Sequence, residues 1–409
     1  YITFFLIYKM TFISDSLNRI KPSATMVITA KAAQLKREGK KVIGLSAGEP
    51  DFDTPDHVKK AAIDAINKGY TKYTDVEGIP ELRQAITDKF KEDNDLSYSI
   101  DDVIVGTGGK QILYNALFSS INKDDEVIIP APYWVSYPDM TLLAGGKPII
   151  VRCSLETDFK LTAKELEKFV TKKSKWLILN SPSNPTGACY SRRELEEIAE
   201  VVRRHDHLYV MTDDIYEHIV YDNFEFFTFA QVAPDLKDRV LTVNGVSKSH
   251  CMTGWRIGYA VGPKMLIKAM TKIQGQSTSN ASSISQYAAL AGISGSNDFL
   301  KPCLKAFDER RHFVVNKLNS IQGISCLLPK GAFYAFPNVS GLVGKKTNNG
   351  KILNNDTDIV EWLLETAEVA AVPGVAFGLE PFFRVSYATS LELLKEAMNR
   401  IEKAVLSLS

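Results

Sequence analysis

The sequence predicts an α/β fold whose sheet is mostly parallel and covered by helices on both faces. Short, fully apolar runs recur through the middle of the 409-residue chain, and amphipathic segments separate them. Strands without polar faces must be buried on both sides, which is typical of parallel sheets packed between helices. A chain of this length also exceeds one ordinary core, so we expect more than one domain.

Six of these apolar runs are expected to be strands. They span residues 103–105, 126–130, 148–152, 176–180, 208–212 and 240–244, with helices near 110–121 and 193–204. Ligands gather at the carboxyl ends of parallel strands. Asn180, Asn184, Asp213 and Lys248 all follow such ends, so we expect the functional site at this edge of the sheet.

The pattern changes after about residue 300. A long helix is expected from about Asp298 to Ile321, with Ser296 or Asn297 as a candidate cap. A mixed region follows, with a strand near 384–387 and a closing helix over 391–408. This order predicts a second, smaller part with helices and strands in separate segments.

Composition excludes several classes of function. The net charge is +1, which offers no electrostatic reason to expect nucleic acid or an anionic membrane as partner. The five cysteines are scattered without a Cys-x-x-Cys pair, and no His-Glu-x-x-His spacing occurs. We therefore expect no disulfide framework, no metal site and a cytoplasmic location.

The first residues need a separate interpretation. Residues 1–8 are apolar but too short to span a bilayer, and they lack the features of a signal peptide. Met10 is a plausible natural start. We therefore interpret residues 1–9 as a disordered or translated leader and leave them out of the fold.

Lys248 is the strongest chemical candidate in the chain. It follows a predicted strand, small residues surround it, and Arg256 comes eight positions later. An amine that forms a Schiff base needs partial burial, and a nearby fixed cation can bind a phosphate. The alternative for Lys248 alone is a surface lysine on a loop.

Asp213, Tyr216 and Asn184 are the second group of candidates. A carboxylate at the end of a buried strand needs a cation, and a protonated pyridine nitrogen would serve. Asn184 and Tyr216 could both donate to a phenolate oxygen, tuning the acidity of a Schiff base. Alternatively, Asp213 or Asp214 caps a helix, and Asn184 belongs to an ordinary turn.

The remaining candidates bind anions or a flat ring. Gly108, Gly109 and Lys110 join a strand to a helix start, which suits a phosphate, although such turns are often only structural. Arg384 in an apolar strand suits a carboxylate, with a structural salt bridge as the alternative. Trp134 could stack on a ring or belong to the core.

Taken in order, these residues resemble the class I pyridoxal-phosphate aminotransferases, in particular the bacterial aspartate aminotransferases of subgroup Iβ. The resemblance runs from about Lys21 to the carboxyl terminus. Its markers are residues 22–25 (Pro-Ser-Ala-Thr), 46–52 (Ser-Ala-Gly-Glu-Pro-Asp-Phe), Tyr73 with 78–83, 132–137, 184–187 (Asn-Pro-Thr-Gly), 213–216 (Asp-Asp-Ile-Tyr), Ser247-Lys248, 252–259 and Arg384.

The resemblance implies fold type I and a homodimer with active sites at the subunit interface. It implies a large domain over residues 51–300, with a mostly parallel seven-stranded sheet between helices. A smaller α+β domain is expected over 301–409, together with residues 10–50. Small amino acids and keto acids would be the substrates.

Residue roles follow from the same resemblance. Lys248 would carry pyridoxal 5'-phosphate as a Schiff base and act as the base, and Asp213 would pair with the pyridine nitrogen. The other residues would bind the ring (Trp134, Asn184, Tyr216), the phosphate (Gly108, Gly109, Lys110, Arg256, and Tyr73 from the partner subunit) or the substrate (Gly48, Lys110, Trp134, Asn184, Arg384).

The implied reaction moves the amino group of L-aspartate to 2-oxoglutarate in a ping-pong cycle that gives oxaloacetate and L-glutamate. The chain departs from many relatives at Gly245. Those relatives carry at this position a residue whose hydroxyl contacts the phosphate. The chain also lacks an arginine between Arg256 and Arg310 for the distal carboxylate, for which Lys110 would substitute. Prephenate or aromatic keto acids are therefore alternative acceptors. A regulator with an aminotransferase-like domain and an inactive scaffold are the competing classes.

Overall fold

The computed structural model describes residues 12–20, 22 and 24–409. The predicted leader at residues 1–9 lies outside the described part of the chain. Among the described residues, no helix combines the length and the apolarity needed to cross a bilayer.

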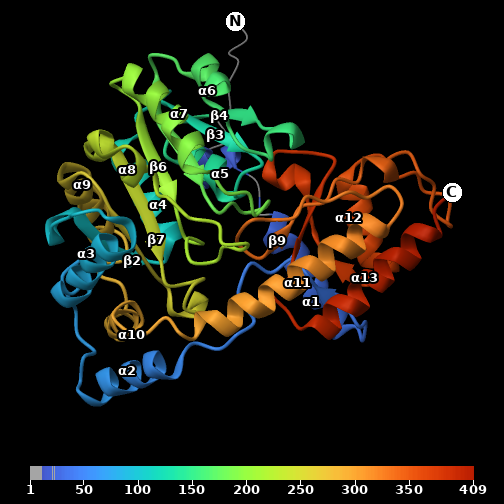
Figure 1. Cartoon of the computed structure of the whole chain (residues 1–409), viewed down its shortest axis with the longest axis horizontal. Coiled ribbons are helices and arrows are strands. Elements are labelled where there is room, and N and C mark those ends of the chain that lie inside the picture. The colour runs from blue at the N-terminus through green and yellow to red at the C-terminus, as the bar shows by residue number, and fades with distance from the viewer. Residues whose placement is uncertain (1–11, 21, 23) are drawn as a thin grey trace, which may run out of the picture.

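A seven-stranded sheet forms the centre of the larger part of the molecule (Figure 1). In spatial order its strands are β2 (Val103–Thr107), β8 (Ile257–Val261), β7 (Val240–Gly245), β6 (Tyr209–Asp213), β5 (Ser174–Asn180), β3 (Glu126–Ala131) and β4 (Lys147–Arg152). Strand β8 is antiparallel to β2 and β7, and every other neighbouring pair is parallel. The predicted mostly parallel sheet is confirmed, and the six apolar runs are all strands.

Strand β8 was not among the expected strands. Gly258 is its second residue, and glycine weakens a strand signal. The glycine is required because a Cβ at this position would lie 2.1 Å from the backbone nitrogen of Gly109. Since β8 runs opposite to β7, its first residue lies at the edge where β5, β6 and β7 end. That reversal places Arg256, the residue before β8, at the predicted site edge.

Helices cover both faces of the sheet. Alternate strand residues point to opposite sides, so a fully apolar strand makes both faces of the sheet apolar. Val103 and Val105 belong to one apolar cluster, and Ile104 between them belongs to another. The first face is covered by α2 (Asp56–Asn67), α3 (Pro80–Asn94), α6 (Ala163–Phe169), α7 (Arg192–Arg204), α8 (Phe229–Val232) and α10 (Ser283–Ile293). The second is covered by α4 (Gly109–Ser120), α5 (Ser136–Leu143) and α9 (Lys264–Gly275).

The smaller part packs around a separate core, and one long helix, α11 (Leu300–Ser320), runs into it from beside α10 (Figure 1). Its other elements are α12 (Asp356–Thr366), α13 (Leu391–Leu406) and the short sheet β11 (Val372–Pro373), β12 (Phe383–Ser386) and β9 (Tyr334–Ala335). Near the amino terminus, α1 (Ala24–Arg37) is followed by β1 (Ile43–Gly44), which pairs with β10 (Val369–Ala370). The domain boundaries stay a prediction.

The predicted cap of the long helix was wrong. Phe299 occupies the cap position, and α11 begins at Leu300. The hydroxyl of Ser296 donates to the carboxylate of Asp298 and accepts from its backbone N–H. Ser296 therefore closes a turn before the helix instead of capping it.

Candidate functional site

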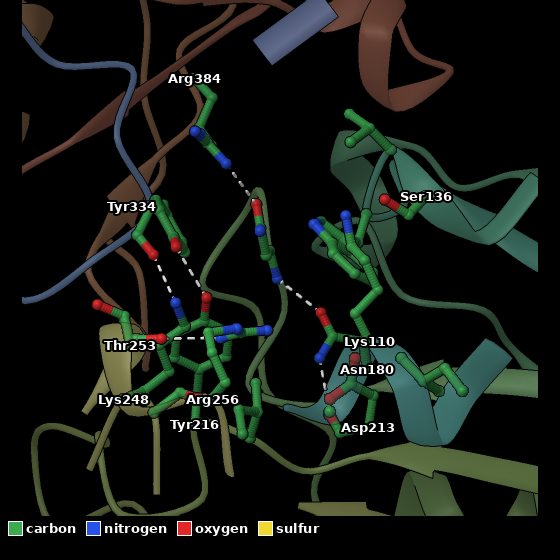
Figure 2. A pocket seen from close by; sticks show the side chains of 18 residues that line it. Lys110, Ser136, Asn180, Asp213, Tyr216, Lys248, Thr253, Arg256, Tyr334 and Arg384 are labelled. Carbon is green, nitrogen blue, oxygen red and sulfur yellow. Dashed lines mark hydrogen bonds between the residues drawn. The ribbon is translucent and has the colours of Figure 1, made fainter. Parts of the chain in front are cut away.

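A cavity of about 290 Å³ lies at the carboxyl edge of the large sheet, where the smaller part meets it (Figure 2). Strands β5, β6 and β12, the start of α4 and the loop after β7 all contribute side chains. Its lining includes Gly48, Gly109, Lys110, Trp134, Asn180, Asn184, Asp213, Tyr216, Ser247, Lys248, Arg256, Tyr334 and Arg384. The cavity thus brings together most of the residues selected from the sequence.

The amine of Lys248 is held inside this cavity. Its Nζ donates a hydrogen bond to the carbonyl oxygen of Gly48, at 2.5 Å. Burial lowers the pKa of Lys248 to about 8, against the opposing charge of Glu49. An amine with this pKa is partly neutral near pH 7.5 and can act as a nucleophile or a base. A loop lysine in solvent would have neither property.

Asp213 ends β6 and is buried. Its carboxylate accepts a hydrogen bond from the hydroxyl of Tyr137, at 2.6 Å. Burial raises the pKa of Asp213 to about 6, although the bonds from Tyr137 and from the backbone of Ile215 oppose the rise. Asn180 fixes the strand end by donating from Nδ2 to the carbonyl oxygen of Asp213, at 2.7 Å. The carboxylate is therefore well placed to receive a cation from the cavity.

The helix-cap interpretation of Asp213 is only partly right. Residues 215–218 form a turn, not a helix, and the carboxylate accepts from the backbone of Ile215 within it. In the sequence, Tyr137 belongs only to the motif at residues 132–137. Its role at Asp213 could not be predicted, because an aromatic residue near a strand end usually belongs to the core.

Arg384 lies on β12 and is 2% exposed. Its Nη1 donates to Oδ1 of Asn184, at 2.9 Å, and its Nη2 donates to the carbonyl oxygen of Ser46, at 2.6 Å. Its Nε is buried without a hydrogen-bond partner among the described residues. Arg384 makes no salt bridge within the described residues, so the structure does not support the alternative of a structural salt bridge. A buried guanidinium with spare donors suits an incoming carboxylate.

The start of α4 and Arg256 form a compact anion site. Gly108 has a φ of +82°, and a Cβ there would lie 2.2 Å from Nη2 of Arg256. Arg256 is itself left-handed, with a φ of +57°, and its Nη1 donates to the carbonyl oxygen of Thr253, at 2.8 Å. A helix N-terminus beside a fixed guanidinium favours a phosphate group.

Lys110 and Trp134 contact each other at the wall of the cavity. The Nζ of Lys110 lies 4.8 Å from the centroid of the indole ring. Partial burial lowers the pKa of Lys110, and the charge of Arg256 adds to the effect. The amine therefore lies over the face of the indole, inside the cavity that both residues line.

Tyr216 and Tyr334 meet at the wall of the cavity. Their hydroxyl oxygens are 2.7 Å apart, and both side chains are buried. The guanidinium carbon of Arg384 lies 4.7 Å from the centroid of the Tyr334 ring. Tyr334 was not predicted as a site residue, because the apolar run around it indicates only a strand of the core.

Gly108 lies beside the cavity, against Arg256, without lining it, but Tyr73 is a predicted site residue that this single chain does not bring near it. Its side chain is 90% exposed, and it does not line the cavity. The resemblance implies a role for Tyr73 in the partner subunit's site. The role of Tyr73 at the partner subunit's phosphate therefore stays a prediction.

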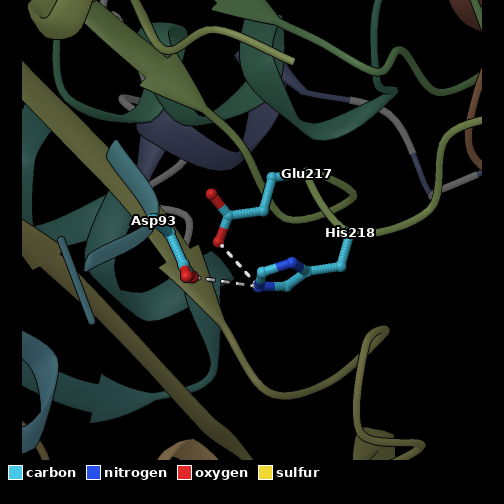
Figure 3. Close-up of side chains that lie close together, drawn as sticks. All are labelled: Asp93, Glu217 and His218. Atoms are coloured by element: carbon cyan, nitrogen blue, oxygen red, sulfur yellow. Dashed lines mark ion pairs between the residues drawn. The ribbon is translucent and has the colours of Figure 1, made fainter. Parts of the chain in front are cut away.

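Two groups of possible metal ligands lie outside the cavity among the described residues: Asp222 with Asp308 and His312, and a second group that Figure 3 shows. Asp93, Glu217 and His218 converge there, and the ammonium group of Lys89 contacts Glu217. Burial alone would raise the pKa of Glu217, but the charges of Lys89 and His218 hold it below its usual value. Asn244 of β7 also donates to Glu217, at 2.8 Å. Lys89 already supplies the positive charge, so the group anchors the loop after Tyr216 to α3.

These features fit the pyridoxal phosphate that the sequence resemblance implies. Asp213 is buried with a raised pKa, which is the setting in which a carboxylate gains most from a cationic ring nitrogen. Gly108 and Gly258 leave no room for a side chain, so backbone and guanidinium approach the anion site closely. Lys248 supplies the partly neutral amine.

Comparison with known proteins agrees with the geometry. The family model for aminotransferases of class I and II matches residues 40–401. A probable aspartate/prephenate aminotransferase of Rickettsia felis is 56% identical over 98% of this chain and 98% of its own length. An aspartate/prephenate aminotransferase of Cereibacter sphaeroides is also 56% identical, over 98% of this chain and 100% of its own.

Solved structures give the same result. The crystal structure of an aspartate aminotransferase from Rhizobium meliloti superimposes with a TM-score of 0.95 at 53% identity, covering 97% of this chain and 99% of the other. A Thermus thermophilus aspartate aminotransferase with maleate gives a TM-score of 0.90 at 41% identity, covering 97% and 100%. The chain therefore belongs to the class I and II aminotransferases.

Proposed function

We propose that this chain transfers the amino group of L-aspartate to 2-oxoglutarate, using pyridoxal 5'-phosphate held by Lys248. The observation that carries the proposal is the convergence of four groups in one cavity: the Lys248 amine, the Asp213 carboxylate, the Tyr216 hydroxyl and the Arg384 guanidinium. The names of the relatives from Rhizobium meliloti and Cereibacter sphaeroides support aspartate as the donor.

The cofactor would be held by residues of three kinds. The start of α4 and Arg256 would bind its phosphate, and Asp213 would keep a proton on its ring nitrogen. Asn184 and Tyr216 would donate to its phenolate oxygen, since the amide nitrogen of Asn184 stays available while Oδ1 accepts from Arg384. When bound, pyridoxal phosphate supplies an aldehyde carbon that reacts with amines and a ring that withdraws electrons from the substrate.

The chain's own residues would then handle the substrate and its proton. Arg384 binds the α-carboxylate through its planar fork, which fixes the orientation of the α-carbon. Lys110 attracts the second carboxylate of a dicarboxylic substrate. The free amine of Lys248 would take the α-proton of the substrate at Nζ. Its lowered pKa keeps part of that amine neutral at neutral pH.

The proposal is tested with a half-reaction. Protein loaded with pyridoxal phosphate is mixed with one amino acid at a time, and the absorbance change of the bound cofactor is followed. We expect conversion with aspartate and glutamate. Borohydride reduction followed by peptide mapping should place the adduct on Lys248. An adduct at another lysine, or no conversion with any amino acid, would disprove the proposal.

Prephenate or aromatic keto acids are a second candidate class of acceptor. The names of the Rickettsia felis and Cereibacter sphaeroides relatives include prephenate. Lys110 offers a flexible point charge at the distal subsite and not a fixed guanidinium fork, which is a less exacting clamp. The same half-reaction, run in reverse on the aminated protein with prephenate, tests this alternative.

Lys110 should discriminate between dicarboxylic and aromatic substrates. We expect Lys110→Ser to raise the KM for aspartate about 10- to 100-fold, because a hydrogen bond to a charged group contributes about 1.5–3 kcal/mol. The KM for phenylalanine should change much less. Steady-state kinetics with both substrates measures the ratio, and Lys91→Ser on the exposed side of α3 is the control. Equal changes in the KM for aspartate and for phenylalanine would show that Lys110 does not recognise the second carboxylate.

The homodimer and the cytoplasmic location are part of the same proposal. The exposure of Tyr73 supports a dimer, because a side chain that would bind the partner's cofactor phosphate has no contact with the cavity of its own chain.

A further inference from the structure

We propose that Tyr334 is a positioning residue that couples the carboxylate-binding arginine to the hydroxyl that tunes the cofactor. The inference rests on the proposed function, and it concerns a residue that does not bond the cofactor itself. Tyr334 lies on β9, lines the cavity and is fully buried. It touches both Tyr216 and Arg384, which come from the two different parts of the molecule (Figure 2).

The direction of the hydrogen bond follows from counting protons. The hydroxyl oxygens of Tyr216 and Tyr334 are 2.7 Å apart, so one of them donates to the other. A phenol carries a single proton. When Tyr216 uses its proton to bond the cofactor's phenolate oxygen, the donor between the two tyrosines must be Tyr334. The result is a chain of two bonds, from Tyr334 to Tyr216 and from Tyr216 to the phenolate.

Such a chain strengthens its last bond. Donation into the oxygen of Tyr216 polarises its O–H group and makes it a better donor. The phenolate is then more stable in its fully charged form, so the cofactor's covalent link to Lys248 loses its proton at a lower pH. Tyr334 thereby acts on the protonation of the cofactor through Tyr216.

The ring of Tyr334 contacts its second partner, Arg384. The guanidinium carbon of Arg384 lies 4.7 Å from the ring centroid, within the range of a cation–π contact. The hydroxyl at the other end of the ring lies against Gly48, where a Cβ would be 2.9 Å from the Tyr334 oxygen. Any tilt of the ring that follows movement of Arg384 would therefore move the hydroxyl. One side chain thus links substrate binding to cofactor chemistry.

Two substitutions separate the hydroxyl from the ring. Tyr334→Phe removes only the hydroxyl, and we expect the pH midpoint of the bound cofactor's absorbance to rise by about 0.2–0.6 units, from a 10–30% weakening of the phenolate bond. The Kd for maleate, an unreactive dicarboxylate, should stay within about twofold because the ring remains. Tyr334→Leu removes the ring, and the Kd for maleate should rise about 2- to 30-fold.

The control is Tyr387→Phe, which also removes one buried hydroxyl. Tyr387 donates to the carbonyl oxygen of Ala332, at 3.1 Å, and does not line the cavity. The pH midpoint of the bound cofactor's absorbance in Tyr387→Phe should match that of the unmodified protein. The double variant Tyr216→Phe with Tyr334→Phe should titrate like Tyr216→Phe alone, since Tyr334 acts through Tyr216.

The outcomes are distinct. An unchanged midpoint in Tyr334→Phe, an equal shift in Tyr387→Phe, or additive shifts in the double variant would each overturn the role of Tyr334 and leave the proposed function intact. If the unmodified protein binds no pyridoxal phosphate, both proposals fail. If Tyr334→Phe does not fold, the absorbance midpoint of Tyr334→Leu is measured instead, because leucine also lacks the hydroxyl. No rise in its midpoint would overturn the inference.

Discussion

The reactivity of Lys248 depends on its surroundings and not on its residue type. A lysine in solvent titrates near pH 10.4, so its amine is almost fully protonated at neutral pH. Burial lowers the pKa of Lys248 to about 8. The contact with the carbonyl oxygen of Gly48 holds the amine inside the cavity. We therefore expect this amine to capture an aldehyde faster at neutral pH than a fully exposed lysine would.

The pH dependence of cofactor capture should report this pKa. With a pKa of about 8, roughly a quarter of the amine is neutral at pH 7.5. We expect the rate at which cofactor-free protein binds pyridoxal phosphate to rise up to about pH 8 and then level off. Rapid-mixing absorbance measures the rate, and Lys248→Ala should abolish the fast phase. A rate that keeps rising tenfold per pH unit to pH 10 would contradict the lowered pKa.

At the scale of the element, the anion site depends on the contact between β8 and the start of α4. Gly258 faces Gly109 so closely that a Cβ would lie 2.1 Å from its backbone nitrogen. Gly258→Ala should therefore displace the first turn of α4. We expect a loss of stability of about 1–3 kcal/mol, as for an overpacked core, and weaker binding of pyridoxal phosphate.

Gly254→Ala is the matched control for this substitution. It lies in the same loop region before β8, and no atom is found within 4 Å of its added Cβ. Thermal unfolding and equilibrium titration with pyridoxal phosphate measure the two effects. If both alanine variants behave alike, the contact between β8 and α4 does not control the anion site.

At the scale of the whole molecule, the site draws on parts that are far apart in the sequence. Gly48, Lys248 and Arg384 come from the amino-terminal segment, the large sheet and the smaller part, and they meet at one cavity. The helix α11 is the long connection between the two parts. A fourth contribution, from Tyr73, would come from a second copy of the chain.

The dimer can be tested through Tyr73. Because this side chain is 90% exposed in the single chain, Tyr73→Phe should leave folding unchanged. If the partner subunit's Tyr73 bonds the phosphate, the Kd for pyridoxal phosphate should rise about tenfold, as expected for one lost bond to a charged group. Tyr70→Phe, from the same segment, is the control. Sedimentation at matched concentrations shows whether the dimer persists; a monomer with full affinity would exclude the role of Tyr73.

Much of the fold was predictable because buried strands leave a clear apolar pattern. The strands that end at Asn180 and Asp213 were expected within one or two residues. Strand β8 was not, because Gly258 interrupts its pattern and its need for a glycine arises from a contact distant in sequence. The ordered motifs also predicted most of the residues that line the cavity. The roles of these residues stay a prediction. Tyr137 and Tyr334 could not be found, because a buried aromatic residue shows no sign of what its hydroxyl will meet.

The reversed direction of β8 has a last consequence for how this protein can be altered. Gly245 and Gly258 are paired across the ladder, so residues 246–257 form a bridge of set span that carries both Lys248 and Arg256. Lengthening or shortening that bridge by a single residue would preserve the surrounding architecture while moving the amine away from the guanidinium. Redesign of this enzyme's specificity is therefore better directed at Lys110 and Trp134, which lie outside that bridge, at the start of α4 and in the segment before α5.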